Sequence, residues 1–261
     1  MEKRKRILLV NDDGLDARGI QILAARLGKT YDVYACAPDR QRSASSHRVT
    51  YFLKDLHATP ADVAGTKAAY RLDGTPADCT YVGLNGLFDG VVFDCVVSGI
   101  NAGWNTASDI DYSGTVSAAL EGHYLGYPAV AVSLDDYDME HGDYRYAAEY
   151  GEKLLAMYLS DPECASYVLN VNVPKGDVLG AEAAIVGGIF PYSRKLEKKD
   201  ENGVTRILCP KDPVPDMEHP DSHSDVAVLQ RHYAAVTPLT RFGSTDEQKY
   251  AYWQRFLGPI D

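Results

Sequence analysis

The hydrophobic residues in the first two thirds of the chain form short runs that alternate with segments of helical spacing. The run Ile7-Leu8-Leu9-Val10 is typical of a short buried strand, and Gly14 allows the chain to turn after it. Apolar residues then recur at helical spacing over residues 20–27, and the next apolar run, residues 31–37, predicts a second strand. This order of strand and helix predicts an α/β fold with a mostly parallel sheet.

The same alternation continues to about residue 180. Residues 169–173 are predicted to form a half-buried strand, because their apolar residues alternate with Asn170 and Asn172. Residues 49–73 are expected to form a peripheral extended segment. The remaining predicted strands span residues 91–97 and 129–134, and the remaining predicted helices span residues 116–126 and 147–158.

From about residue 181 onward, short extended pieces and charged, proline-containing loops replace this alternation. We expect a closing strand near residues 233–239 and a last helix that begins at Ser244, where a capping-box pattern starts. The chain is therefore divided into a core, residues 1–180, and an accessory and oligomerisation region packed on it, residues 181–261.

One polar motif predicts structure rather than chemistry. The segment Thr75-Pro76-Ala77-Asp78 has a capping hydroxyl, a proline at the first helical position and an acid three residues after the cap. It predicts the start of a helix, and this start is a sufficient explanation for Thr75 and Asp78.

The length, composition and net charge of the chain limit the domain organisation and the kinds of molecule that it is expected to bind. The chain has 261 residues, 45% of them hydrophobic, which is enough for one large α/β domain with or without a small appendage. Its formal net charge of −11 repels a nucleic acid backbone, so no nucleic acid polymer is expected as a partner. An anionic substrate would need a local positive centre, and a divalent cation would supply one.

Targeting signals and cysteines point to the cytoplasm. Only four apolar residues follow the basic start Lys3-Arg4-Lys5-Arg6, so we expect neither an export signal nor a membrane span. The five cysteines contain no C-x-x-C pair and are interpreted as reduced thiols.

Two adjacent acids, Asp12 and Asp13, directly follow the first predicted strand. In an open α/β sheet, ligands bind at the carboxyl ends of the strands, so an acid pair there favours a metal cation or proton transfer. The alternative is a solvated loop in which one acid caps the next helix. Capping needs only one acid, which favours the functional interpretation.

Polar loops follow two further predicted strands and would reach the same edge of a parallel sheet. The loop of residues 39–47 offers the Ser43 hydroxyl and His47, which is a candidate proton shuttle. The glycine-containing loop of residues 98–105 carries the amides of Asn101 and Asn105. A surface loop of this composition is often merely solvated, and that alternative stays open.

A third polar cluster, Ser113-Gly114-Thr115, precedes the helix predicted from Val116. Free backbone N–H groups and the positive end of the helix dipole make such a start an anion site. The alternative is that Ser113 or Thr115 simply caps the helix.

Taken together, these motifs resemble the SurE (survival protein E) family of nucleotidases. The resemblance spans nearly the whole chain, although residues 190–225 match poorly and Ala44 stands where glycine is common. The motifs that carry it are, in order, Asn11-Asp12-Asp13-Gly14, Ala37-Pro38-Asp39-Arg40 with Ser43, Gly74-Thr75-Pro76-Ala77-Asp78-Cys79, Ser98-Gly99-Ile100-Asn101 with Gly103 and Asn105, Tyr112-Ser113-Gly114-Thr115, Asn170-Val171-Asn172-Val173-Pro174 and Val236-Thr237-Pro238-Leu239.

The resemblance implies a Rossmann-like core with helices on both faces and hydrolysis of nucleoside monophosphates with one divalent cation, Mg²⁺ or Mn²⁺. The activity implied is that of a 5′-nucleotidase, with 3′-nucleotides and polyphosphates left open as substrates. The implied metal ligands are Asp12, Asp13, Ser43 and Asn101, and the implied phosphate-binding residues are Asn105, Ser113, Gly114 and Thr115.

The donor atoms agree with this implication, because carboxylate, hydroxyl and amide oxygens suit a hard cation and disfavour zinc. We expect attack by a metal-activated water, with Asp12 and Asp13 as the catalytic residues. Covalent attack by Asp12 is the alternative. His47 or a water on the metal could protonate the leaving group.

Two other functions fit parts of this sequence pattern. A phospho-receiver module also carries an acid pair after its first strand, but it would be about half this length. A non-catalytic nucleotide- or phosphate-binding regulatory module would have no use for a cluster of hard-metal ligands. Release of phosphate from AMP separates the enzyme from both.

Assembly is predicted from the helix that begins at Ser244. Its aromatic and aliphatic residues cover an arc of roughly 160°, wider than a surface helix needs. We expect a homodimer or homotetramer, in line with the family resemblance. The alternative is that the tyrosine hydroxyls allow these side chains to stay exposed to water.

Overall fold

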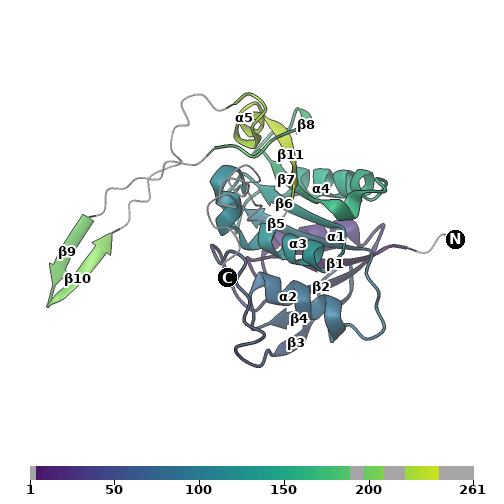
Figure 1. Cartoon of the computed structure of the whole chain (residues 1–261), viewed down its shortest axis with the longest axis horizontal. Helices are drawn as coiled ribbons and strands as arrows, with labels where there is room; N and C mark the ends of the chain where they lie inside the picture. The colour runs from purple at the N-terminus through teal and green to yellow at the C-terminus, as the bar shows by residue number, and fades with distance from the viewer. Residues whose placement is uncertain (1–3, 189–196, 209–220, 241–261) are drawn as a thin grey trace, which may run out of the picture.

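A nine-stranded sheet forms the centre of the molecule. The structure is a computed structural model that describes residues 4–188, 197–208 and 221–240. The strand order is β3-β4-β2-β1-β5-β6-β7-β11-β8 (Figure 1). The strands span β1 Arg6–Val10, β2 Asp32–Pro38, β3 Ala58–Ala61, β4 Thr66–Leu72, β5 Cys95–Ala102, β6 Ala129–Leu134, β7 Val168–Val173, β8 Gly180–Ala183 and β11 Tyr233–Leu239.

All pairings from β4 across to β7 are parallel, whereas β3 pairs antiparallel with β4, and β11 with β7. The prediction of a mostly parallel α/β sheet is confirmed. The helices span α1 Arg18–Leu27, α2 Pro76–Val82, α3 Gly114–Tyr124, α4 Arg145–Tyr158 and α5 Asp225–Gln230, with short η1 Gly83–Leu87, η2 Ala107–Tyr112 and η3 Cys164–Ser166. None of the helices in the described ranges is long and apolar enough to span a membrane.

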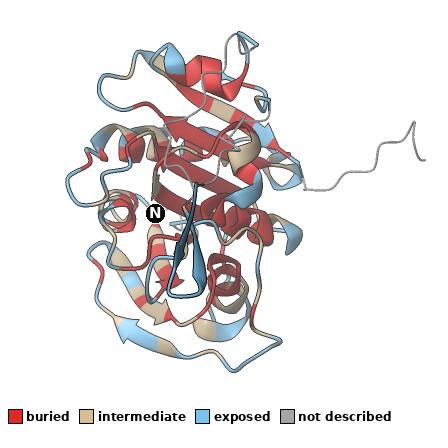
Figure 2. Cartoon of the chain, turned by 90° about the vertical axis from the view of Figure 1, so that its left-hand side faces the viewer, coloured by how far each residue is buried: buried red, intermediate tan, exposed pale blue. Residues whose placement is uncertain are grey.

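The alternation of side chains along β1 explains why helices cover both faces of the sheet. Ile7 and Leu9 point into a core shared with α1 and α4, whereas Leu8 and Val10 point into a second core shared with α2 and α3. The central strands are buried on both sides (Figure 2). The first apolar run of the sequence therefore contributes side chains to both hydrophobic cores.

Strand β5 differs from its prediction. It begins at Cys95, four residues later than predicted, and continues into the predicted loop as far as Ala102. Gly99 has a φ of +136°, and a Cβ at this position would lie 2.3 Å from the Val132 carbonyl oxygen. The pairing register with β6 shifts at this point, so the glycine forms an irregularity inside a strand and does not end it.

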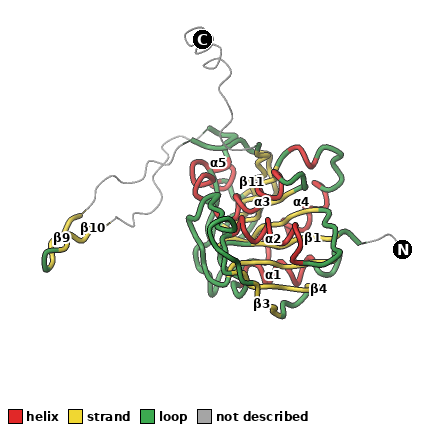
Figure 3. The backbone as a smooth tube through the Cα atoms, turned by 60° about the horizontal axis from the view of Figure 1, so that its bottom comes forward, coloured by secondary structure: helices red, strands yellow, loops and turns green. Residues whose placement is uncertain are grey.

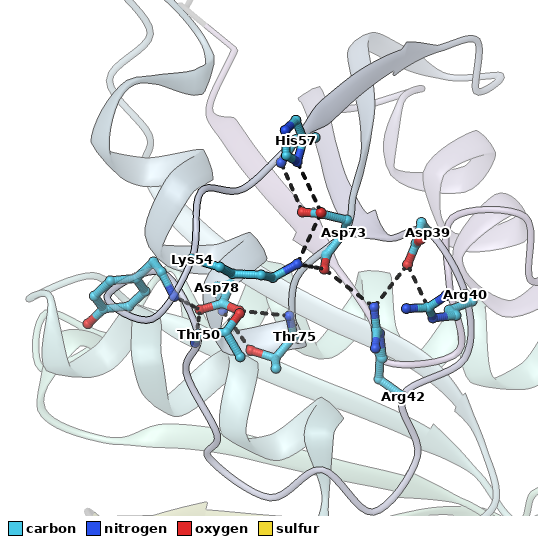
Figure 4. A network of polar contacts seen from close by, with 10 residues as sticks. Asp39, Arg40, Arg42, Thr50, Lys54, His57, Asp73, Thr75 and Asp78 are labelled. Carbon is cyan, nitrogen blue, oxygen red and sulfur yellow. Dashed lines mark hydrogen bonds and ion pairs between the residues drawn. The ribbon is translucent and has the colours of Figure 1, made fainter.

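The prediction for residues 49–73 is also wrong in part. Strand β4 pairs in parallel with β2 and is an integral part of the sheet, and Thr50 directly precedes a turn at residues 51–53. Asp78 holds this turn, because it accepts hydrogen bonds from the Thr50 backbone N–H (2.7 Å) and the Thr50 hydroxyl (2.6 Å; Figure 4). Such contacts are not visible in local sequence preferences.

The prediction of a half-buried strand at residues 169–173 is wrong as well. All six residues of β7 are buried, and the amides of Asn170 and Asn172 form hydrogen bonds inside the protein. An alternating polar pattern therefore indicates a buried polar network here, and not a solvated face.

In the C-terminal region, β8 and β11 extend the same sheet, and α5, which the sequence pattern did not predict, packs on β11. Strands β9 (Glu197–Glu201) and β10 (Val204–Leu208) form a separate hairpin that stands away from the sheet (Figure 1). The predicted helix from Ser244 lies outside the described residues. The division at residue 180 remains a prediction.

The predicted helix start at Thr75 is confirmed. Its hydroxyl accepts a hydrogen bond from the Asp78 backbone N–H at 3.2 Å, and Asp78 Oδ2 accepts one from the Thr75 N–H at 2.9 Å. We predict that Thr75→Ala lowers the free energy of unfolding by about 1 kcal/mol, because the cap is lost. Urea denaturation measures this, with Thr59→Ala on the exposed side of β3 as a control that should change stability by less than about 0.5 kcal/mol. Equal stability of both variants would contradict the capping role.

Candidate functional site

The loops that follow the parallel strands gather at one edge of the sheet, opposite the end where the N-terminus lies (Figure 3). Strands β2, β1 and β5 are neighbours in the sheet, so the loops after them meet. A cleft of about 570 Å³ opens among these loops. The sequence-predicted residues that line it are Asp12, Ser43, Asn101, Asn105 and Ser113.

The loop after β1 is fixed by Asn11 and Gly14. The Asn11 amide donates to the Gly14 carbonyl oxygen (2.9 Å), and the Gly14 N–H donates to Asn11 Oδ1 (3.2 Å). Gly14 has a φ of +97°, a conformation that glycine adopts without strain. This turn places two consecutive carboxylates, Asp12 and Asp13, in buried positions at the strand end.

Asp12 is joined to the start of α3. The Thr115 hydroxyl donates to Asp12 Oδ1 at 2.5 Å. Gly114 makes room for this contact, since a Cβ there would lie 2.8 Å from Asp12 Cβ and 2.9 Å from Asp12 Oδ2. Thr115 and Gly114 thus lie behind the acid and shape its position. Sequence spacing alone did not reveal this role.

Asp13 lies beside the loop after β5. Its Oδ2 accepts a hydrogen bond from the Ala102 backbone N–H at 3.1 Å. Burial and the neighbouring Asp12 charge raise the pKa of Asp13 to about 7, and burial also raises the pKa of Asp12.

The acid pair lacks a compensating positive charge among the residues that the structure describes. None of the described residues lining the cleft is a lysine, arginine or histidine, and no ion pair to Asp12 or Asp13 is formed within the described ranges. Two buried carboxylates without a counter-charge are costly. The site therefore fits a cation, and the ligands predicted from the sequence, two carboxylates with a hydroxyl and an amide, would all offer oxygen atoms.

Ser43 reaches the cleft from the loop after β2. It is exposed, and the Gln41 side-chain amide donates to its hydroxyl at 3.0 Å. The loop is attached to the segment before α3, because the Ser46 N–H donates to the Tyr112 carbonyl oxygen at 3.0 Å. Ala44 has a φ of +55°, which explains why glycine suits this position.

His47 lies outside the residues that line the cleft. Its Nε2 lies 2.8 Å from Glu121 Oε2, and its ring stacks on Tyr124 with a centroid distance of 5.4 Å. These contacts attach the end of the Ser43 loop to α3. The contacts give His47 an anchoring role, and the proton shuttle considered from the sequence stays a prediction.

Asn101 and Asn105 play different parts. Asn101 donates its side-chain N–H to the Gly103 carbonyl oxygen at 2.7 Å, an orientation in which its side-chain oxygen is the atom left for a ligand. The Asn105 amide instead donates to the Ser133 hydroxyl at 2.8 Å. The side chains of Asn170 and Asn172 both donate to the Asn105 carbonyl oxygen, so this residue is held in a buried amide network.

Ser113 is the N-cap of α3. Its hydroxyl oxygen accepts a hydrogen bond from the Val116 N–H at 3.0 Å. Capping and ligand binding are compatible here, because the hydroxyl hydrogen is still available to donate into the cleft.

Sequence reasoning missed the aromatic side of the cleft. In the loop after β6, Asp136 is buried and forms an ion pair with Lys175 (3.1 Å). The same loop brings Tyr137 to the cleft. The available signal was an aromatic residue placed among acids directly after a strand. The lining residues not predicted are Gln41, Ala44, Ala102, Trp104, Asp109, Tyr112, Tyr137 and Met139.

Comparison with known proteins agrees with this geometry. The family model described as "Survival protein SurE" matches residues 7–189. The chain belongs to the SurE family. A 5′-nucleotidase SurE of Syntrophomonas wolfei is 34% identical over 98% of each chain, and one of Nitrosococcus oceani is 38% identical over 93% of this chain and 95% of its own. The crystal structure of the SurE protein from Aquifex aeolicus superposes with a TM-score of 0.80 at 29% identity, covering 96% of this chain and 99% of that one.

The raised pKa of Asp13 predicts the pH dependence of the metal-free SurE fold. The unfolded pKa is near 3.8 and the folded pKa about 7, so the folded state binds more protons between these values. Stability of the chelator-treated protein should therefore fall as pH rises from about 4 to about 7. Asp13→Asn should reduce this loss, leaving the part that comes from the raised pKa of Asp12, and raise the melting temperature at pH 8 by a few degrees.

Thermal unfolding in EDTA across this pH range measures the effect. Asp16→Asn is the matched control. The pKa of Asp16 is shifted in the opposite direction to that of Asp13, because an exposed hydrogen-bonded ion pair with Arg71 lowers it. The control should not be more stable than the parent at pH 8. A metal-free Asp13→Asn variant that is less stable than the parent at pH 8 would show that this acid supports the fold.

Proposed function

We propose that this chain is a divalent-metal-dependent phosphatase that hydrolyses nucleoside monophosphates, with 5′-monophosphates as the substrates. Membership of the SurE family makes it a hydrolase of phosphoric monoesters, and its curated relatives are named 5′-nucleotidase. The observation that carries the proposal is the hydrogen bond from Thr115 to Asp12. It joins a buried acid to the N-terminus of α3, which supports a proposed cation site next to a proposed anion site.

The metal would be Mg²⁺ or Mn²⁺, held by Asp12, Asp13, Ser43 and Asn101. The oxygen donors and the uncompensated acid pair described above support this assignment. When bound, such a cation neutralises phosphoryl charge and lowers the pKa of an attacking water.

The chain's own groups would bind and orient the phosphate. The backbone N–H groups at the start of α3, around Gly114 and Thr115, face an anion with the positive end of the helix dipole. The Ser113 hydroxyl would donate its hydrogen to a phosphate oxygen while its own oxygen stays bound to the Val116 N–H. Asn105 would contribute mainly by fixing the loop that lines this end of the cleft.

Phosphate release from AMP tests this proposal. We predict that dialysis against EDTA abolishes activity and that Mn²⁺ or Mg²⁺ restores it. Asp12→Asn should lower kcat/KM by at least about 100-fold, because the proposed cation loses a charged ligand that lies next to the proposed phosphate site. Asp16→Asn, four residues along the same loop and exposed, should keep the parent rate. Full activity in excess EDTA would refute the metal-dependent mechanism. Binding of AMP without release of phosphate would favour a regulatory module.

We also propose that the chain forms a homodimer or homotetramer. The β9–β10 hairpin turns at Asn202-Gly203 with positive φ at both residues, and Val204 and Ile207 are 68% and 54% exposed. An isolated two-stranded hairpin is marginally stable in water, so a second copy that covers these side chains would stabilise it.

Sedimentation velocity tests the assembly. We predict that the full chain sediments as a dimer or larger species at micromolar concentration, and that Val204→Asp with Ile207→Asp shifts it to a smaller species. Val92→Asp provides the control, since Val92 is exposed but lies outside the hairpin. A parent protein that is monomeric under these conditions would contradict the proposal.

A further inference from the structure

Gln41 lines the cleft but has no role in the chemistry proposed above. It lies in the loop after β2, two residues before Ser43, and its side-chain amide donates two hydrogen bonds. One goes to the Ser43 hydroxyl oxygen at 3.0 Å and the other to the Met139 sulfur at 3.3 Å. Strands β1 and β5 separate β2 from β6, so the amide joins a candidate metal ligand to a loop from a distant part of the sheet.

The chemistry of the two acceptors fixes the orientation of the amide. A thioether sulfur has no hydrogen to donate, so the group that faces Met139 is the NH2 of Gln41 and not its oxygen. Both amide hydrogens then have an acceptor. The Ser43 oxygen has two lone pairs, and after it accepts the bond from Gln41 one of them is still available to a cation.

The backbone on both sides of Gln41 is held against the loop that carries the acid pair. The Arg42 N–H donates to the Asp12 carbonyl oxygen at 2.7 Å. The backbone of Arg40 packs on Gly14, where a Cβ would lie 3.3 Å from the Arg40 carbonyl carbon. The Gln41 side chain therefore starts from a fixed position.

Met139 offers a fixed acceptor, because it lies in a tightly bonded turn. The Asp138 carboxylate accepts hydrogen bonds from the backbone N–H groups of Glu140 (3.1 Å) and His141 (2.8 Å). The Gly142 N–H donates to the Asp138 carbonyl oxygen at 2.9 Å. The amide of Gln41 is thus supported from both of its ends.

The Ser43 side chain, by contrast, is exposed, and the chain next to it departs from regular structure. Ala44 and Ser46 both have positive φ, +55° and +51°. An exposed serine populates several rotamers, and a ligand that needs one of them has to order it at a cost in affinity. The bond from Gln41 selects one orientation of the Ser43 oxygen in advance.

Asp13 adjoins the same amide. Burial and the charge of Asp12 raise the pKa of Asp13, and the side chain of Gln41 acts in the opposite direction, because an N–H donor favours the carboxylate. Gln41 therefore faces two of the four predicted metal ligands, Asp13 and Ser43. Hydrogen-bond partners of this kind orient the ligands of a metal and tune its affinity.

We propose that Gln41 is a positioning residue, whose amide holds the Ser43 hydroxyl oxygen in the orientation that a cation ligand needs, with Met139 as the support of that amide. This inference rests on the proposed metal-dependent function of the same site. It makes the affinity for the cation depend on a contact between the loops after β2 and β6.

Calorimetric titration of the chelator-stripped protein with Mn²⁺ tests the role of Gln41. Gln41→Met keeps an unbranched side chain of similar length and removes both N–H donors. The affinity for Mn²⁺ should fall about fivefold, because the Ser43 side chain is no longer ordered in advance. Gln230→Met is the matched control and should keep the parent affinity, since Gln230 is exposed at the end of α5 and lies outside the cleft lining.

The same titration in a Ser43→Ala background shows whether Gln41 acts through Ser43. There, Gln41→Met should change the affinity by less than about twofold, because the hydroxyl that the amide orients is already absent. Met139→Leu, which keeps the apolar volume but removes the sulfur acceptor, should weaken Mn²⁺ binding by about twofold in the parent and have no effect in Gln41→Met. A residue that merely supports the loop would give the same loss in both backgrounds.

An unchanged Mn²⁺ affinity in Gln41→Met, or an equal loss in the parent and Ser43→Ala backgrounds, would overturn the inference and leave the proposed function intact. A parent protein that binds Mn²⁺ but releases no phosphate from AMP would refute the proposed function, and the titrations would still decide the role of Gln41. A parent protein that does not bind Mn²⁺ would overturn both.

Discussion

The uncompensated charge of Asp12 and Asp13 is the constraint around which the site is built. Burial of two adjacent carboxylates raises the pKa of both, and the described residues that line the cleft include hydroxyl and amide groups but no basic side chain. The strand that carries the pair, β1, is buried on both faces, so its packing in two cores offsets this cost. Unfavourable burial of charged groups at the end of a strand is typical of a functional site.

The contacts around the pair join the separate loops into one unit. Thr115 ties Asp12 to α3, the Ala102 backbone ties Asp13 to β5, and Ser46 ties the Ser43 loop to the backbone of Tyr112. Each loop thus reaches the cleft already oriented by its neighbours. Such preorganisation spares a bound ligand the cost of ordering the loops.

Local signals predicted the regular elements well. Periodicity placed β1, β6, β11 and α4 within one or two residues of their observed bounds, and the motif at Thr75 predicted a capping box that is present. The same reasoning failed where long-range contacts decide structure. Gly99 resembles a loop glycine but sits inside β5, and Asn170 and Asn172 resemble solvated residues but hold Asn105.

In the site, too, local sequence signals predicted some residues and missed those that depend on long-range contacts. The oxygen donors could be predicted because they follow strand ends, whereas the aromatic wall could not, since Tyr112 and Tyr137 come from segments brought together only by the tertiary fold. The contacts of His47 could not be predicted for the same reason, because its partners Glu121 and Tyr124 lie more than 70 residues away in the sequence.

Calorimetric titration of the chelator-stripped protein with Mn²⁺ tests the central claim, that the buried acid pair holds a divalent cation. The account predicts saturable binding of one Mn²⁺ per chain in the parent, and affinity at least about tenfold weaker in Asn101→Ala and weaker still in Asp12→Asn. Binding of equal affinity in Asp12→Asn and the parent, or no binding to the parent, would contradict it.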